Sequence, residues 1–307
     1  MPEANISTPQ PHPYACAQYA TAFAPAEVLA LPNANTHALL RTIPGTDLQD
    51  ACGCYPLFVF DDVDGLGKDF DSLSARGVVS FVGVTDCLTQ PDEASLGAHF
   101  DLARPFKTHN VYDARQPNAD YSKHHRDRVR RAHRKCETRV VPLAEYLDQW
   151  CVCYDTLIKR KNITGVQAFP REYFARIAQM ESAVTIAAFA EGQFVSGHIW
   201  FRHQDKVYAH LAASTELGYK LLSSFAIYDH AIQMFCQDHI IDLGAGAGTE
   251  ATETDGLSLF KKGFANTERK NYLCGKILDQ EKYADLSGLR QEGPDFFPAY
   301  RRPGAAD

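Results

Sequence analysis

The sequence predicts an α/β (α+β) protein in which strands and helices alternate. Two turns, "EGQ" and "HQDK", divide the apolar stretch from Ala183 to Ser214 into three strands of an antiparallel meander. Between Leu143 and Ile158, apolar residues recur at intervals of three and four, as in a helix with one buried face. The chain has 307 residues, of which 45% are hydrophobic and 22% charged, enough for one large or two modest domains.

The first half gives weaker signals than the second. Residues 1–35 are rich in Pro, Ala, Asn and Ser, so we expect an irregular arm. Strands are expected at Tyr55–Asp62 and Gly77–Asp86, with a short helix or a loop between them. Asp101–Asn118 has no clear periodicity and is expected to be a loop.

The second half begins with the basic stretch "SKHHRDRVRRAHRKCETR", whose arginines recur at helical spacing. Pro142 then suits the start of the helix described above, and "PREYFARIAQM" predicts another short one. After the meander we expect a helix, a buried strand, a short helix and a last strand. These lie in "LLSSFAIYDHAIQMFCQD", "HIIDLGAG", "DGLSLFKKGFAN" and "RKNYLCGKILD".

Composition excludes several classes of protein. The net charge is -7, so any site for a polyanion must be a local patch. The nine cysteines are scattered, and the pairs Cys52/Cys54 and Cys151/Cys153 lack zinc-finger spacing, so we expect reduced thiols and no metal site. The N-terminus does not resemble a signal peptide, and no apolar run has the roughly 20 residues that cross a bilayer. We therefore expect a cytoplasmic protein without a transmembrane segment.

The stretch "DLGAGAG" from Asp242 to Gly248 suggests a nucleotide-binding loop, but its context does not. The dinucleotide fingerprint needs a further glycine three residues after Gly246, where this chain has Thr249. Only 59 residues follow Gly248, too few for the βα units that such a fold requires. Glycines also allow a ligand to approach the backbone closely. A strand that separates from its neighbour to admit a ligand would have such a sequence.

The pieces "IDLGAGAGTEATETDGLSLFKKGFA", "TELGYK" and "HHRDRVRRAHRKC" together resemble the GNAT superfamily of N-acyltransferases, in particular its Fem-like branch. The resemblance extends from about Ser122 to Asp279. It implies a GNAT-type mixed, mostly antiparallel sheet flanked by helices. It also implies two GNAT-like domains, which we place at residues 36–140, in degenerate form, and 141–307.

The resemblance implies transfer of an acyl group to an amine. The leading hypothesis is an acyl-CoA donor and an amine of a small metabolite, amino sugar or cell-surface precursor, including nucleotide-linked ones. An aminoacyl-tRNA donor is the alternative, with tRNA as partner, and a GNAT scaffold that only binds a partner is a third. No metal is expected in any of them, and the oligomeric state is left open.

In such proteins the donor arm enters between two separating strands, here "VYAHLAAS" and "IIDLGAG", and its pyrophosphate meets the start of the next helix. Helix starts offer free N–H groups to anions. A capped helix start without a ligand is the other interpretation of this segment. The donor-binding residues implied are Ser214, Leu217, Gly218, Tyr219, Lys220, Gly244 and Gly246.

The resemblance also places a catalytic pair at Phe260 and Lys261, whose ammonium would stabilise negative charge on the acyl oxygen. Lys262 is more typical of a solvated helix end. Tyr272 is the candidate to protonate a departing thiolate. A base is expected among Asp242, His210, Glu250 and Asp255, although Asp242 also suits a turn and His210 a buried core.

The basic helix has two interpretations. Its arginines either pair with an acidic face of the same protein or bind a phosphorylated acceptor or the backbone of a tRNA. For an acceptor pocket, the candidate residues are Lys107, His109, His124, His125, Arg126 and Arg130. The loop from Thr164 contributes Gln167 and Phe169 as further candidates, or simply ends a helix.

Overall fold

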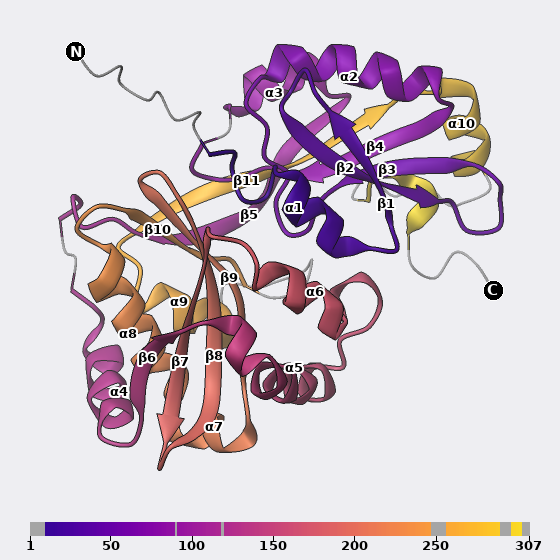
Figure 1. Cartoon of the computed structure of the whole chain (residues 1–307). Helices are drawn as coiled ribbons and strands as arrows, with labels where there is room; N and C mark the ends of the chain where they lie inside the picture. Colours follow the sequence, from indigo (N-terminus) through magenta and orange to yellow (C-terminus); the bar gives the residue numbers. More distant parts are fainter. Residues whose placement is uncertain (1–9, 90, 118–119, 247–255, 289–295, 303–307) are drawn as a thin grey trace, which may run out of the picture.

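The computed structural model describes residues 10–89, 91–117, 120–246, 256–288 and 296–302. In these residues eleven strands form one continuous sheet with helices on both faces (Figure 1). The strand order is β1-β2-β3-β4-β11-β5-β10-β9-β8-β7-β6. The mixed, mostly antiparallel sheet that the sequence predicts is therefore confirmed.

The strands of the first half are short, apart from the one that borders the second half. They are β1 (Glu27–Leu31), β2 (Thr36–Thr42), β3 (Gln49–Gly53), β4 (Val78–Val84) and β5 (Leu102–Tyr112). Those of the second half are β6 (Glu137–Val141), β7 (Ala183–Ala190), β8 (Gln193–His203), β9 (Lys206–Ser214), β10 (Ile240–Gly244) and β11 (Thr267–Ile277).

The helices fall between these strands. In the first half they are α1 (Ala17–Ala20), η1 (Thr21–Phe23), α2 (Val63–Ala75) and α3 (Glu93–His99), and the second half begins with α4 (Lys123–His133). The helices that follow it are η2 (Leu143–Tyr146), α5 (Leu147–Lys161), η3 (Gly165–Gln167), α6 (Arg171–Ile177), α7 (Glu216–Leu221), α8 (Ser223–Phe235), α9 (Gly256–Lys262), α10 (Gln280–Gly288) and η4 (Ala299–Arg301). No helix in the described ranges is long and apolar enough to cross a bilayer.

The elements expected in the second half are present in the expected order, but β6, α7 and α10 were not expected. β7, β8 and β9 form the antiparallel meander, and the basic stretch forms α4. The helix expected in "LLSSFAIYDHAIQMFCQD" is α8, and the segment "TELGYK" before it forms a separate short helix, α7, because Leu222 between them has a left-handed backbone with φ +62°.

Three predictions for the first half are wrong. The expected arm contains α1, η1 and β1, and its Tyr14 and Tyr19 are buried. Tyr55–Asp62 is not a strand, although Phe58 makes an isolated bridge to Thr85. The expected loop at Asp101–Asn118 is mostly β5, whose partners β10 and β11 lie more than a hundred residues later in the chain.

β5 and β11 join the two halves of the molecule. β11, from the end of the chain, lies between β4 and β5 and is antiparallel to both. Figure 1 shows these two long strands crossing from the upper half to the lower half. The division at residue 140 stays a prediction, but the sheet itself is continuous across it.

The helices of the second half cover opposite faces of its strands (Figure 1). On one face, α5 and α6 pack with the N-terminal segment through Trp150, Phe174, Tyr14 and Tyr19. On the other face, α4, α8 and α9 enclose a separate apolar core. The short helix α9 is thereby fixed close to the ends of β5 and β10.

Gly263 follows α9 and allows α4 to approach it. His125 of α4 donates from Nε2 to the Phe260 carbonyl at 2.8 Å, and its ring covers Gly263. A Cβ atom at residue 263 would overlap this ring. The glycine of the "FKKGF" motif therefore has a packing role.

Gly263→Ala is expected to lower the free energy of unfolding by about 1–3 kcal/mol, because the added methyl group displaces His125. Gly67→Ala in α2 is the matched control, since a Cβ there meets nothing within 4 Å. It should leave stability unchanged or raise it by up to about 1 kcal/mol. Denaturant unfolding measures both, and equal effects would contradict this packing role.

Candidate active site

The parallel neighbours β9 and β10 separate after a short ladder. In the described chain they share three residue pairs, of which the last joins Asp242 to Tyr208. β9 continues to Ser214 beside β8, whereas β10 continues to Gly244 beside β5. The separation of strands that the sequence suggested is therefore present, and it begins at Asp242.

Two backbone irregularities accompany this separation. The β8–β9 register skips His210, which makes it the extra residue of a β-bulge. Gly244 has φ +83°, a left-handed conformation that glycine adopts readily, and a Cβ there would also meet the Lys261 ammonium. Both irregularities lie where the two strands part.

Asp242 is buried at this point and is held from two directions. The Nδ1 atom of His109, on β5, lies 2.8 Å from Oδ2 and 3.0 Å from Oδ1. The Gly244 amide donates to Oδ1 at 2.7 Å. On its other side, the His109 ring meets Asn271 of β11, with Nε2 3.0 Å from the Asn271 Nδ2 atom. Asp242, His109 and Asn271 thus link three adjacent strands.

The charge of Asp242 is maintained despite its burial. Burial alone would raise the pKa of this carboxyl. His109, the Gly244 amide and the Lys261 ammonium outweigh burial and hold the pKa below its ordinary value. Asp242 is therefore a buried carboxylate at neutral pH.

Lys261 is held at the same strand end. Its Nζ atom donates to the Ala245 carbonyl at 2.7 Å, and its charge also lowers the pKa of the buried His198, after burial itself. A second ammonium, on Lys107 of β5, donates to the Gly246 carbonyl at 3.1 Å. Lys262 instead points to solvent and pairs with Glu268 at 3.4 Å. The two adjacent lysines therefore differ, as the sequence suggested.

Phe260 packs into an aromatic cluster. Its ring lies 4.8 Å from Phe225 and from Tyr228, measured between centroids. This packing fixes α9 against α8, so Phe260 holds the helix that carries Lys261.

His210 has the environment of a core histidine. Tyr14 lies 3.2 Å from its Nδ1 and Tyr173 2.9 Å from its Nε2, so both ring nitrogens are occupied. Burial lowers its pKa to about 3. These features oppose the predicted role as a base. Tyr272 packs against the core of the first half, and Glu250 and Asp255 lie outside the described residues.

Comparisons with known proteins bear on the family and the fold. A family model described as "Acetyltransferase (GNAT) domain" matches residues 123–251. The match covers less than half of the chain, and this segment therefore resembles a GNAT acetyltransferase domain. The recognition made from the sequence is thereby confirmed, and the match begins with the basic helix α4. No curated protein matches the chain.

Solved structures extend the likeness in fold to both halves. FemX has a TM-score of 0.64 at 13% identity, over 89% of this chain and 94% of that one. L-PGS from Bacillus licheniformis has a TM-score of 0.55 at 13% identity, over 89% and 94%. A conserved protein of unknown function from Bacteroides thetaiotaomicron has a TM-score of 0.59 at 12% identity, over 88% of this chain and 93% of that one. At these identities the likeness shows the fold alone.

Two residues of the predicted donor-binding segment have structural roles. The Gly218 amide donates to the Thr215 hydroxyl at 3.1 Å, and a Cβ at residue 218 would overlap the Val195 carbonyl. Ser214 is buried, with its hydroxyl 2.7 Å from that of Ser196. Gly218 and Ser214 therefore serve packing and capping.

The remaining residues of this segment are more accessible. Leu217 and Lys220 are exposed, and Tyr219 is half-buried with the Arg160 guanidinium 4.4 Å from its ring centroid. Their role in donor binding stays a prediction, as do those of Gly244 and Gly246 at the separated strand ends.

The residues predicted for the acceptor are not brought together. His125 and Phe169 are buried, the second with its ring 4.2 Å from that of Tyr173, so both have packing roles. His124 and Gln167 are exposed. Lys107 and His109 lie instead at the strand end described above, and His109 is a partner of Asp242.

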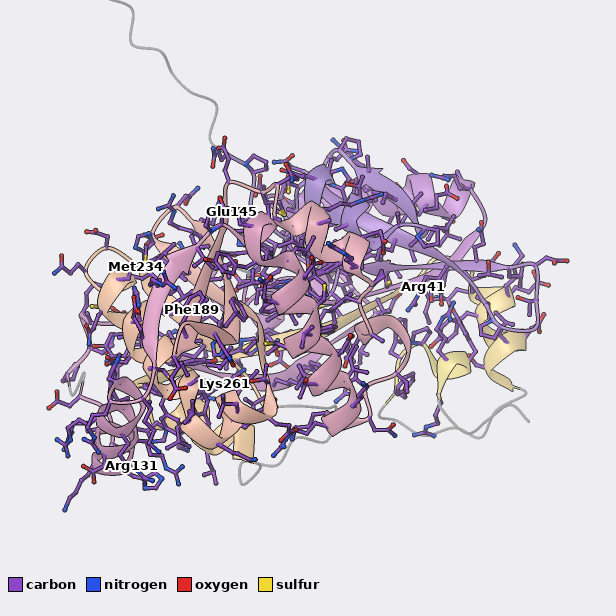
Figure 2. The ribbon with its side chains drawn as sticks, turned by 60° about the horizontal axis from the view of Figure 1, so that its bottom comes forward. Arg41, Arg131, Glu145, Phe189, Met234 and Lys261 are labelled. Carbon is purple, nitrogen blue, oxygen red and sulfur yellow. The ribbon has the colours of Figure 1, made fainter. Side chains whose placement is uncertain are left out.

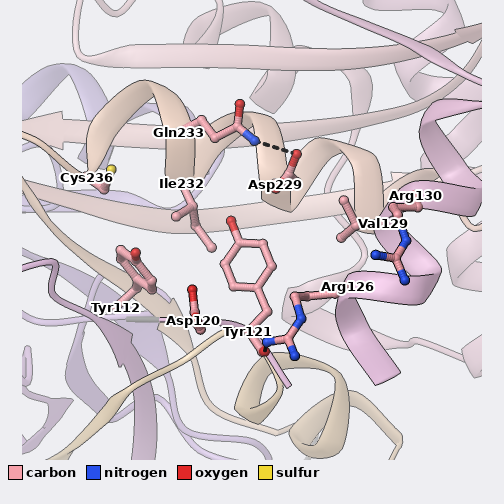
Figure 3. Close-up of a pocket in the computed structure, with 10 residues that line it drawn as sticks. All are labelled: Tyr112, Asp120, Tyr121, Arg126, Val129, Arg130, Asp229, Ile232, Gln233 and Cys236. Atoms are coloured by element: carbon pink, nitrogen blue, oxygen red, sulfur yellow. Dashed lines mark hydrogen bonds between the residues drawn. The ribbon is translucent and has the colours of Figure 1, made fainter. Parts of the chain in front are cut away.

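Arg126 and Arg130 line a pocket of about 430 Å³ between α4 and α8 (Figure 3). It also contains the carboxylate of Asp229, which accepts from Gln233 at 2.8 Å. Its lining includes neither Asp242 nor Lys261. The pocket is therefore distinct from the strand opening.

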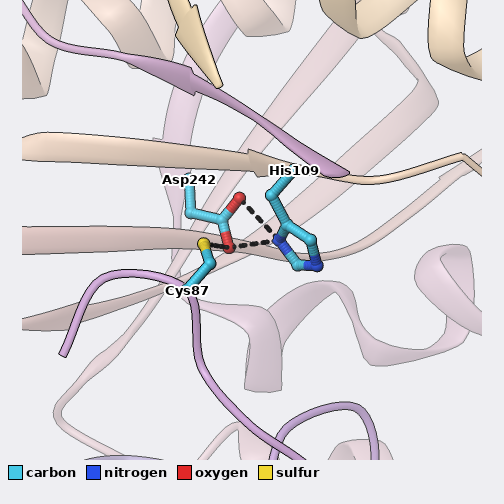
Figure 4. Close-up of side chains that lie close together, drawn as sticks. All are labelled: Cys87, His109 and Asp242. Carbon is cyan, nitrogen blue, oxygen red and sulfur yellow. Dashed lines mark hydrogen bonds and ion pairs between the residues drawn. The ribbon is translucent and has the colours of Figure 1, made fainter. Parts of the chain in front are cut away.

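Cys87 completes a group of three side chains with His109 and Asp242 (Figure 4). Its Sγ atom lies 3.7 Å from Asp242 Oδ2, and burial, with Asp242 and Asp86, raises the pKa of the thiol. The three side chains offer ligand atoms within 4.8 Å of one another. A metal on Nδ1 of His109 would place the ring proton on Nε2, against the Asn271 Nδ2 atom, which is itself a donor. The hydrogen bonds therefore do not fit a metal, whose absence stays a prediction.

Burial lowers the pKa of His12, His198 and His210 to about 3, so these residues bind protons mainly in the unfolded chain. Their contribution to stability is complete above pH ~6.5 and is lost as the pH falls toward ~3. In this pH range the free energy of unfolding of His210→Gln should fall with decreasing pH less steeply than that of the parent, by about 1.4 kcal/mol per pH unit. Denaturant unfolding across this range measures the slope, with the exposed His124→Gln as control. Parallel curves for parent and His210→Gln would contradict the prediction.

Proposed function

We propose that the protein is an N-acyltransferase that moves an acyl group from acyl-CoA to an amine. The acceptor would be an amine of a small metabolite, an amino sugar or a cell-surface precursor. One observation carries the proposal: β9 and β10 part at Asp242, and the Lys261 ammonium lies beside the end of β10. The opening suits a slender donor arm, and the ammonium suits the charge that its carbonyl develops.

The reaction places negative charge on the acyl oxygen. The amine nitrogen attacks the thioester carbon, a C–N bond forms, and the carbonyl oxygen becomes an oxyanion. The intermediate then breaks its C–S bond, and the proton lost from nitrogen ends on the departing thiolate. Lys261 stabilises the oxyanion, because a fixed cation in a largely buried site acts strongly on charge that appears in the transition state.

We assign Asp242 a role in positioning. The carboxylate is 3% exposed, and His109 and Gly244 already donate to it. An amine proton therefore has no direct path to it in this arrangement. Asp242 holds the loop that carries Ala245, to which Lys261 is bonded.

A second candidate function is aminoacyl transfer from aminoacyl-tRNA, and the surface of α4 favours it. Seven Lys and Arg residues lie between Lys123 and Lys135, with Asp127 as the one acidic residue among them. Arg131, Arg134 and Lys135 are exposed and form no ion pair with a carboxylate of the described chain. Figure 2 shows Arg131 at the outer edge of the molecule. The expected pairing with an acidic face is therefore not seen for these three, and a polyanion would fit there.

Equilibrium binding distinguishes the two donors. We expect CoA to bind the parent chain with a dissociation constant below about 1 mM, and bulk tRNA to bind more weakly at physiological salt. The double variant Arg131→Glu/Arg134→Glu should leave CoA binding unchanged. Lys68→Glu/Arg76→Glu, in α2 and at its C-cap, changes the net charge by the same amount and is the matched control. Tight tRNA binding that only the α4 variant abolishes, without CoA binding, would replace the first function by the second.

Lys261→Ala should lower turnover of acetyl-CoA with a set of simple amines by about 100-fold, with a smaller change in KM. The reason is that the lost charge acts mainly in the transition state. The matched control is Lys262→Ala, which removes an exposed ammonium from the same helix and should stay within about twofold of the parent. Thioester absorbance follows the reaction. Equal turnover of the two variants would exclude the proposed role of Lys261.

A further inference from the structure

A chain of hydrogen bonds crosses three strands and ends at the proposed catalytic site. The Lys107 backbone amide, on β5, donates to Oδ1 of Asn271 on β11 at 2.9 Å. Asn271 then meets His109, and His109 meets Asp242, at 3.0 and 2.8 Å. Asn271 is 1% exposed, so water does not compete for these contacts. No motif or periodic pattern in the sequence singles out Asn271.

The direction of each bond follows from the first one. A backbone amide only donates, so the Asn271 atom that faces Lys107 is the amide oxygen. The Nδ2 group, which only donates, therefore faces Nε2 of His109. Nε2 must accept, and the ring proton lies on Nδ1, where it is donated to the Asp242 carboxylate. The tautomer of His109 is thus set by Asn271.

The backbone itself creates the need for Asn271. The β5–β11 register shifts between Lys270 and Tyr272, and Asn271 is the residue between them. At such a shift a backbone amide loses its partner in the ladder. The Asn271 side chain supplies that partner to Lys107, so its orientation is part of the sheet.

The chain continues from Asp242 to the catalytic ammonium. Asp242 accepts from the Gly244 amide, and the carbonyl of the next residue, Ala245, accepts from Lys261. Other titratable groups interact electrostatically with Asp242. They are Lys261, Cys87, Asp86, Tyr208, Tyr228 and Tyr14. Of these groups, Lys261 is the one cation, and its Nζ atom is bonded to the loop that Asp242 holds.

We propose that Asn271 is a positioning residue: it fixes the proton of His109 on Nδ1, which orients the Asp242 carboxylate against Gly244 and so sets the place of the Lys261 ammonium. The inference rests on the proposed function only in treating Lys261 as the catalytic group. Asn271 does not touch the reacting atoms.

The first test is the tautomer of His109, read from the side-chain ¹⁵N shifts of the histidine-labelled full chain at neutral pH. His109→Gln assigns the signals. In the parent we expect a protonated Nδ1 and an unprotonated Nε2. In Asn271→Asp, which still accepts from Lys107 but cannot donate, Nε2 should become protonated. A protonated Nε2 in the parent, or an unchanged spectrum in Asn271→Asp, would overturn the proposal.

The second test is the accessibility of Lys261 to acetic anhydride, read by peptide mass spectrometry with Lys262 as the internal standard. Asn271→Asp should raise the ratio of Lys261 to Lys262 modification by about threefold or more, as expected for the loss of one net hydrogen bond. Asn266→Asp is the matched control, because Asn266 also accepts from a backbone amide, that of Asp113 directly after β5, at 3.0 Å. Equal ratios in both variants would overturn the proposal.

Neither readout needs a donor, so the two proposals fail separately. If both readouts behave as expected while the parent leaves acetyl-CoA intact, the positioning network stands and the proposed function is wrong. If acetyl-CoA is consumed but Asn271→Asp changes neither readout, the function stands and the role of Asn271 is wrong. Should Asn271→Asp fail to fold, the tautomer in the parent chain alone decides.

Discussion

The opening between β9 and β10 exists because β10 stays paired with β5 after its pairing with β9 has ended. After Asp242, β10 leaves β9 and stays with β5 as far as Gly244, because Asp242 is bonded to His109 on β5. The β-bulge at His210 and the left-handed Gly244 allow this departure without breaking the sheet elsewhere. The opening is therefore built into the strand pairing and does not depend on a flexible loop.

This arrangement makes the site a property of the whole chain. The GNAT family model ends at residue 251, yet His109 comes from β5 and Asn271 from β11, both outside the matched segment. Cys87 follows β4, from still earlier in the chain. A fragment limited to residues 123–251 would lack the partners that hold Asp242. The likeness in fold to FemX and L-PGS, which covers both halves, agrees with this interdependence.

The elements that the sequence predicted correctly are those whose partners are near in the chain. The β7–β9 meander and α5 carry their own periodic apolar pattern, and the "FKKGF" motif pointed to Lys261 over Lys262. β5 was missed because it contains Pro105 and several polar residues, and its ladder comes from β10 and β11. His109 was noted for the wrong reason and Asn271 not at all, since their roles arise only when distant strands become neighbours.

Hydrogen exchange of the backbone amides, with and without saturating CoA, tests the central claim that a donor arm lies between β9 and β10. A bound donor arm should slow exchange in residues 209–214 and 242–246, with little change in α4. CoA binding that protects only the pocket between α4 and α8, or that leaves both strand ends unchanged, would contradict it.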